Sequence, residues 1–193
     1  EITLLATGPL GNLSAAALED PDFFKKIKQI VTMGGYLQPV QLGYRDLKEL
    51  NFSAHPEAAL RVLSAACTVT VFPAQVCLEA PYRFREIRRT DYWPGWMKRA
   101  LIQWLITFGL YTGEMVFYLW DLLPAVFLIK RELFEVQPFS LGSTLADLQR
   151  GMLIQAQGEP AQKIFLALKL KNHKSFYEEL DRGWRAAVNH YPL

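Results

Sequence analysis

The sequence has few cysteines, almost no net charge and no apolar run long enough to cross a membrane. Its two cysteines, Cys67 and Cys77, are too few for a disulfide framework and lack CxxC spacing for zinc, so a reducing compartment such as the cytoplasm is expected. A formal net charge of +2 gives no strong field for nucleic acid. The most apolar stretch, residues 100–113, runs for 14 residues without a charge, whereas a spanning helix needs ~20. We therefore expect neither nucleic acid nor a membrane as a partner.

Apolar side chains are abundant, at 51% hydrophobic and 13% aromatic residues in a chain of 193. That composition is typical of a globular protein, and the length suits a single domain, 1–193, with a substantial core. The basic residues are scattered apart from RFREIRR at 83–89. We interpret this cluster as a solvated helix face rather than a phosphate-binding patch.

The first eighty residues alternate between short β-prone runs and helical patterns, and one helix begins at Pro56, with proline at the favoured first position. This alternation predicts an α/β fold with an open, mostly parallel sheet, in which ligands bind at the carboxyl ends of the strands. A helical side region, a β-rich piece and a closing helix are expected to follow. The expected strands are 2–6, 27–33 and 68–76, the helices are 13–27 (broken near Pro21), 56–66 and 175–188, the helical region is 80–130 and the β-rich piece is 133–157.

Asp121 is the only charged residue in VFYLWDLLPAVFLI, residues 116–129. An ionised carboxylate in an apolar setting is costly, so such a group pairs with a cation, binds a metal or becomes protonated. The residues alone leave two alternatives open. Asp121 lies at a solvent edge, or it faces something cationic.

Four segments together carry a family resemblance: LLATGPLGNLSAAAL at 4–18, IVTMGG at 30–35, ELNFSAHPEAA at 49–59 and YLWDLLPA at 118–125. In order and spacing the chain resembles the C-terminal two-thirds of the inosine-uridine-preferring nucleoside hydrolase family. The resemblance implies hydrolysis of the N-glycosidic bond of purine or pyrimidine ribonucleosides by water that a calcium ion activates.

By the same resemblance, Asp121 and the main-chain carbonyl of Thr7 would hold the calcium ion. Calcium takes about six to eight oxygen ligands, including carboxylates and carbonyls. A carbonyl at the end of a strand, beside Gly8-Pro9, is not used in helix hydrogen bonds. From the residues alone, Thr7 is an ordinary turn residue.

The resemblance places Met33, Glu49 and Asn51 against the ribose and Trp120 against the base. A carboxylate and an amide two residues apart in an extended segment project to the same side, which suits the hydroxyls of a furanose. Many family members have His at the position of Trp120, but purine-specific members have Trp, whose stacking on a base contributes on the order of 1–3 kcal/mol. The alternative for Glu49 and Asn51 is a polar loop facing water. For Met33 it is a core methionine, and for Trp120 a core tryptophan.

Other positions depart from the family pattern. Tyr44 replaces the Asn of a Gly-Asn pair, His55 replaces an Asp that caps a helix, and Gln75 replaces another Asp. The aspartate cluster that supplies the family's general base has no match, because Asp20 and Asp22 are better interpreted as surface acids. We therefore expect the catalytic base outside this chain, and this chain alone to be inactive.

The chain opens within an expected strand, which predicts exposed sheet edges along residues 2–6 and 27–33. We expect a homo-oligomer, or a complementary N-terminal chain, to cover these edges. Two further hypotheses stay open. One is a degenerate relative that binds or assembles without catalysis, which the departures favour, and the other is a membrane-associated protein built on 101–129.

Overall fold

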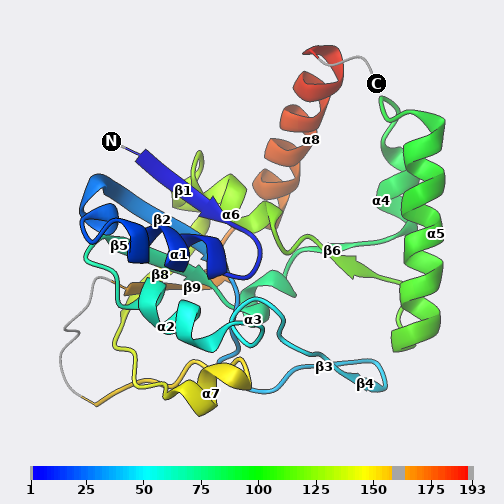
Figure 1. The fold of residues 1–193 in the computed structure, drawn as a ribbon. Coiled ribbons are helices and arrows are strands. Elements are labelled where there is room, and N and C mark those ends of the chain that lie inside the picture. Colours follow the sequence, from blue (N-terminus) through cyan, green and yellow to red (C-terminus); the bar gives the residue numbers. More distant parts are fainter. Residues whose placement is uncertain (1, 158–163, 191–193) are drawn as a thin grey trace.

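A five-stranded sheet lies at the centre of the molecule (Figure 1). The computed structural model describes residues 2–157 and 164–190. The strands follow the order β1-β2-β5-β9-β8, in which the first four are parallel and β8 is antiparallel to β9. The bounds are β1 (Ile2–Ala6), β2 (Ile27–Met33), β5 (Thr68–Phe72), β8 (Phe134–Phe139) and β9 (Ile164–Leu170). The predicted open, mostly parallel sheet is confirmed.

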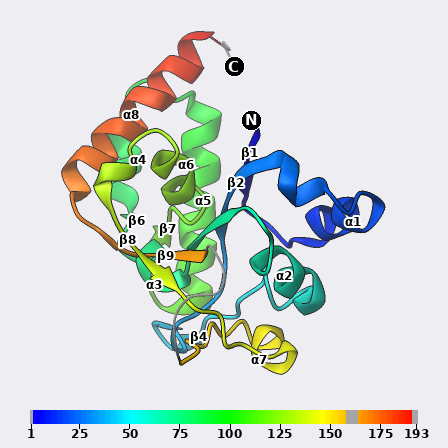
Figure 2. The ribbon, with the colours of Figure 1, turned by 90° about the vertical axis from the view of Figure 1, so that its left-hand side faces the viewer.

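Helices cover both faces of this sheet (Figures 1 and 2). Alternate side chains of the strands enter two different cores, so that Ile30 packs on one face of β2 and Val31 on the other. The first face is covered by α1 (Gly11–Glu19), α2 (Pro56–Leu63) and α7 (Leu145–Gln149). The second is covered by α3 (Ala74–Cys77), α6 (Leu122–Phe127) and α8 (His173–His190). Two 3-10 turns, η1 (Phe23–Lys26) and η2 (Arg131–Leu133), complete these layers.

Residues 83–116, here called the arm, leave the sheet and return to it. The antiparallel pair β6 (Pro81–Tyr82) and β7 (Phe117–Tyr118) joins the arm to the rest of the chain. The arm contains α4 (Phe84–Arg89) and α5 (Gly95–Thr112), and Figure 1 shows α5 standing well apart from the sheet. A hairpin of β3 (Gln41–Leu42) and β4 (Arg45–Asp46) reaches the far end of α5. The predicted helical side region corresponds to this arm.

Three sequence expectations about the strands were wrong. The third strand ends at Phe72, because Pro73 cannot donate to the sheet and a short helix follows it. The piece 133–157 contains one long strand, β8, followed by α7, and the interior strand β9 was missed. A continuous apolar run such as that of β9 does not distinguish a strand from a buried helix. Residues 27–33 are not an edge, because β2 pairs with both β1 and β5.

Three smaller features bear on the sequence expectations, and the surface position of Asp20 and Asp22 is confirmed. Both cysteines are free and buried. Asp20 and Asp22 form surface ion pairs with Lys26 and Lys25. Within residues 2–157 and 164–190, none of the helices combines the length and the apolarity that crossing a bilayer demands.

Phe72 tests the account of the core. It is fully buried at the end of β5, and its ring lies 5.3 Å from the rings of both Phe127 and Phe134. We expect Phe72→Ala to lower the free energy of unfolding by about 3–5 kcal/mol, because it opens a cavity between the sheet and α6. Urea denaturation measures this loss. Phe84→Ala, at an exposed ring on α4, is the control, and similar losses for both variants would contradict this packing.

Candidate functional site

The carboxyl ends of β1, β2 and β5 meet at one edge of the sheet, where a cavity of about 250 Å³ opens. All six residues singled out from the sequence line this cavity. They are Thr7, Met33, Glu49, Asn51, Trp120 and Asp121. Thr7 follows β1 and Met33 ends β2, while Trp120 and Asp121 lie between β7 and α6. The loop before α2 supplies the other two residues. Segments far apart in the sequence thus converge on one site.

Asn51 ties the ends of two strands together. Its Nδ2 donates to the Met33 carbonyl at 2.9 Å and lies 3.4 Å from the Thr7 carbonyl. Among the described residues no donor reaches its Oδ1. The side chain therefore positions the strand ends with its NH₂ group and keeps an acceptor available for a hydroxyl in the cavity.

Glu49 is buried, and its carboxylate accepts hydrogen bonds from backbone N–H groups. Oε1 accepts from Asn51 at 2.8 Å, Oε2 accepts from Ser53 at 2.8 Å, and Phe52 donates to both oxygens. Gly35, whose φ of 82° suits only glycine readily, adds a longer contact of 3.3 Å. Residues 51–54 form a turn rather than the extended segment expected. Glu49 therefore fixes this turn. Its contact with a sugar stays a prediction, in which a sugar hydroxyl would donate one further hydrogen bond to the carboxylate.

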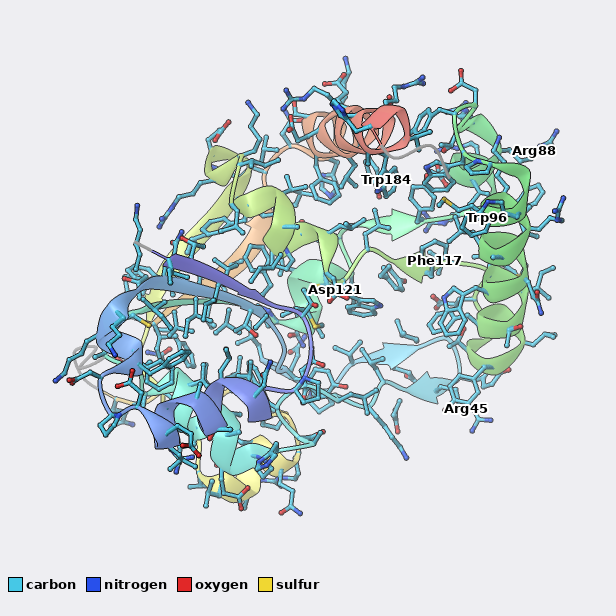
Figure 3. All side chains as sticks on the ribbon, turned by 45° about the horizontal axis from the view of Figure 1, so that its top comes forward. Arg45, Arg88, Trp96, Phe117, Asp121 and Trp184 are labelled. Atoms are coloured by element: carbon cyan, nitrogen blue, oxygen red, sulfur yellow. The ribbon has the colours of Figure 1, made fainter. Side chains whose placement is uncertain are left out.

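Asp121 lies at an exposed edge of the cavity, between the sheet and the arm (Figure 3). Among the described residues, no lysine, arginine or histidine nitrogen lies within 4.0 Å of its carboxylate. Partial burial against the apolar wall raises the pKa of this carboxyl above its usual value. Of the two alternatives from the sequence, the solvent edge describes Asp121, and the carboxylate remains available to a ligand.

Aromatic side chains form much of the remaining wall. Trp120 is half-buried and tilts against Tyr118, with the ring centroids 5.5 Å apart. Phe108 from α5 and Tyr36 also line the cavity. The Tyr36 hydroxyl donates to the Leu47 carbonyl at 2.6 Å, and burial together with the nearby Glu49 charge raises its pKa. Tyr36 is therefore a neutral wall residue rather than a proton donor at neutral pH.

The sequence reasoning missed several lining residues: Tyr36, Leu47, Lys48, Leu50, Ala74 and Phe108. Lys48 and Leu50 flank Glu49, so the motif there could have indicated them. Phe108 gave no such signal, because only the folding of the arm brings α5 to the cavity.

Tyr44 and Gln75, two of the residues that depart from the family pattern, form hydrogen bonds in this structure. Tyr44 donates from its hydroxyl to the Leu110 carbonyl and from its backbone to Thr112, which fastens the β3–β4 hairpin to α5. Gln75 accepts from Leu37 N–H at 3.0 Å and donates to the Gln38 carbonyl at 2.6 Å. His55 stands at the start of α2 without capping it, as expected.

Comparison with known proteins adds independent information. A sequence profile described as "Inosine-uridine preferring nucleoside hydrolase" matches residues 1–178. The pyrimidine-specific ribonucleoside hydrolase RihA of Shewanella oneidensis is 28% identical over 176 residues, covering 86% of this chain and 54% of that protein. Uridine nucleosidase 1 of Arabidopsis thaliana is 40% identical over 72 residues, covering 37% of this chain and 21% of that protein. The chain spans about half the length of the first of these relatives.

Solved structures show the same likeness. An inosine-uridine preferring nucleoside hydrolase from Bacillus anthracis has a TM-score of 0.68 and 27% identity, covering 94% of this chain and 59% of that one. A plant nucleoside hydrolase has a TM-score of 0.79 at 21% identity, covering 94% of this chain and 61% of that one. At 21% identity, the likeness to the plant nucleoside hydrolase is evidence for a shared fold only.

The Glu49 carboxylate generates a prediction about stability. Glu49→Gln should lower the free energy of unfolding by about 1.5–3 kcal/mol, because hydrogen bonds to a buried charge are lost and an amide NH₂ is turned toward backbone N–H donors. Glu57→Gln is the matched control, since the Glu57 side chain is 64% exposed. Urea denaturation compares the two, and an equal effect of both changes would mean that Glu49 does not fix the turn.

Proposed function

Because the chain belongs to the inosine-uridine preferring nucleoside hydrolase family, we propose that its cavity binds a ribonucleoside for hydrolysis of the N-glycosidic bond. The observation that carries the proposal is the convergence of the six predicted residues on one cavity at the carboxyl edge of the sheet. A purine or a pyrimidine nucleoside would fit the proposal equally.

In the proposed complex the ribose lies over the strand ends. The free Oδ1 of Asn51 accepts a hydrogen bond from a ribose hydroxyl, and Met33 packs against the sugar. Glu49 holds the turn from which Asn51 projects. In the proposed complex the Glu49 carboxylate also contacts the edge of the sugar. Trp120 offers the face of its indole ring to the base, and stacking of this kind makes a base a better leaving group.

Two groups in the cavity suit a hard cation. Asp121 contributes a carboxylate that no cation in the described part of the chain pairs with, and the Thr7 carbonyl has a second lone pair beside the one that faces Asn51. These oxygens are the donor type that calcium prefers, but fewer than the about six it takes. No group of three or more His, Cys, Asp or Glu side chains in the described ranges could hold a metal ion. We propose that Asp121 and Thr7 hold one side of a calcium ion, which when bound would lower the pKa of the attacking water.

The general base is proposed to come from elsewhere. Asp121 and Glu49 are the acidic residues that line the cavity, and no histidine joins them in the described part of the chain. Asp121 is assigned to the metal, and the oxygens of Glu49 already accept four backbone N–H groups. The outer edge of β1 pairs with no strand among the described residues. We propose that a strand-bearing segment, in the same protein or another chain, adds there and supplies the missing acids.

The second candidate function is nucleoside binding without hydrolysis. It is favoured by this lack of a free base in the described cavity and by the scaffold roles of Tyr44 and Gln75. Release of ribose from inosine or uridine separates the two candidates, because only hydrolysis produces a reducing sugar.

Asp121 tests the metal assignment. We expect calcium to raise the affinity of the chain for inosine or uridine at least about tenfold, or 1.4 kcal/mol, and Asp121→Asn to remove this dependence. Partial burial raises the pKa of the Asp121 carboxyl, so the fold gains nothing from its charge, and the neutral amide should not destabilise the chain. Isothermal titration calorimetry measures the effect, with Asp22→Asn as a control at a surface acid. A calcium effect that survives Asp121→Asn would remove Asp121 from the metal site.

Trp120 tests the placement of the base. We expect Trp120→Ala to weaken binding of purine nucleosides by about 1–3 kcal/mol, and of pyrimidine nucleosides by less, because a purine offers more stacking surface. Trp120→Phe should restore much of the loss, since it keeps an aromatic face. Equal losses for both classes of nucleoside in a calorimetric titration would mean that Trp120 only packs against Tyr118.

A further inference from the structure

The basic cluster RFREIRR, residues 83–89, borders a cavity as well as facing solvent. Its four arginines are exposed, as the interpretation of a solvated helix face requires. Three of them, Arg83, Arg85 and Arg89, also line a cavity of about 420 Å³, here called the arginine cavity. The opposite wall comes from α8, and the volume is within the about 300–1,000 Å³ of small-molecule sites. The arginines thus surround a space in which a small ligand fits.

Two positive charges at the arginine cavity have no acidic partner. Glu86 accepts hydrogen bonds from the Arg83 backbone N–H at 3.0 Å and from the Arg85 side chain at 3.1 Å, so its carboxylate pairs with Arg85. No carboxylate in residues 2–157 and 164–190 lies within 4.0 Å of the Arg83 or Arg89 guanidinium group. Arg85 and Arg89 also lie four residues apart on α4, a spacing at which like charges destabilise a helix. An anion bound among the arginines would relieve this repulsion.

Asp181 does not supply that anion, although it lines the same cavity. Its carboxylate accepts hydrogen bonds from the Tyr92 hydroxyl at 2.8 Å and from the Arg185 side chain at 2.8 Å. The Arg185 guanidinium holds the pKa of this carboxyl below its usual value. Asp181 is thus ionised and already paired, and the charges of Arg83 and Arg89 remain available to a ligand.

Aromatic side chains form a further wall of the arginine cavity, namely Tyr82, Tyr92, Tyr177 and Trp184. The Tyr82 ring packs edge-on against Trp184, with centroids 5.8 Å apart, and Figure 3 shows Trp184 on the side of α8 that faces the arm. The tyrosine hydroxyls already have protein partners. That of Tyr82 lies 3.2 Å from the Thr90 hydroxyl, and that of Tyr177 donates to a carbonyl of β6. These residues therefore offer ring surface, rather than polar groups, to a ligand.

We propose that the arginine cavity binds a phosphate monoester that carries a planar ring, as a nucleoside 5′-monophosphate does. A phosphate monoester carries about −1.5 to −2 charges at pH 7, which matches the charges of Arg83 and Arg89, whereas a carboxylate would neutralise only one of them. The planar fork of arginine binds phosphate oxygens in pairs. The ring of the ligand then lies against the aromatic wall, where contact between rings adds to the attraction of the charges.

A single phosphate suits this cavity better than a nucleic-acid backbone does. Proteins that bind single strands spread their cations along a groove that follows the backbone. Here the cations gather at one cavity, and the chain has a net charge of only +2. The ligand is therefore a small molecule rather than a polymer.

The arginine cavity is separate from the candidate site, because no residue in the described ranges lines both cavities. The proposal accordingly does not rest on the proposed function. The two cavities share the arm, since α4 borders one of them and Phe108 of α5 lines the other. A ligand in the arginine cavity would link α4 to α8 and so stabilise the start of the arm.

Isothermal titration calorimetry of the full chain with phenyl phosphate and with inosine 5′-monophosphate tests the site. We expect both to bind, and Arg89→Gln or Arg83→Gln to raise each Kd at least about tenfold, because a charge-assisted hydrogen bond is lost. Both arginines are exposed, so neither change should alter the fold. Arg88→Gln is the matched control on the same helix. Arg88 lies 5.7 Å from the Phe84 ring centroid and does not line the cavity, so each Kd should change less than about twofold.

Further ligands identify what the cavity recognises. Inorganic phosphate should bind more weakly than phenyl phosphate because it lacks a ring, and inosine should not displace inosine 5′-monophosphate. Tighter binding of the nucleotide than of phenyl phosphate would identify a nucleotide as the ligand, and the reverse order a smaller aryl ester.

Four results would overturn the proposal. They are equal effects of Arg88→Gln and Arg89→Gln, inorganic phosphate binding as tightly as phenyl phosphate, displacement of the nucleotide by inosine, and no binding of phenyl phosphate at millimolar concentration. Displacement by inosine would place the nucleotide in the candidate site instead, so the outcome for the arginine cavity is distinct from that for the proposed function.

Discussion

The candidate site depends on the buried Glu49 carboxylate, which holds a turn against the end of β2. By accepting hydrogen bonds from the backbone of Asn51, Phe52 and Ser53, it sets the direction in which Asn51 projects. Asn51 in turn joins the carbonyls of Met33 and Thr7. Two parallel strands and a loop thus become one rigid floor, and Asp121 faces that floor from the β7–α6 connection. A ligand that needs both oxygens and an apolar wall finds them preassembled.

Phe108 of the arm lines the cavity beside these strand ends. The contacts around the arm and the cavity give structural roles to Tyr44 and Gln75, which depart from the family pattern. Tyr44 and Arg45 contact the last carbonyls of α5, which fastens the hairpin to the arm. Gln75 holds the loop after Gly35 through both ends of its amide. The Tyr44 and Arg45 contacts fasten the helix that carries Phe108, which lines the cavity, so Tyr44 has a structural role although it departs from the family pattern.

Much of the fold could be predicted from the sequence, because local signals and topology agreed there. The runs at 2–6 and 27–33 are strands with those bounds, and Pro56 begins a helix. The six site residues came from the family resemblance, and the structure gathers all six around one cavity, while their roles stay predictions. Strand β9 and Phe108 could not be predicted, since an apolar run has no period to distinguish strand from helix and a helix of the arm reaches the cavity only through tertiary packing. The engagement of Glu49 with its own turn was likewise invisible, because it depends on backbone geometry.

The central claim is that the oxygens of Asp121 and Thr7 receive a cation beneath a ribose. A crystal structure of the chain grown with calcium and inosine tests it most directly. The account predicts density for the ion between the Thr7 carbonyl and the Asp121 carboxylate, with the sugar against Asn51 and the base against Trp120. A nucleoside bound elsewhere, or an Asp121 side chain turned into bulk solvent with no ion beside it, would contradict the account.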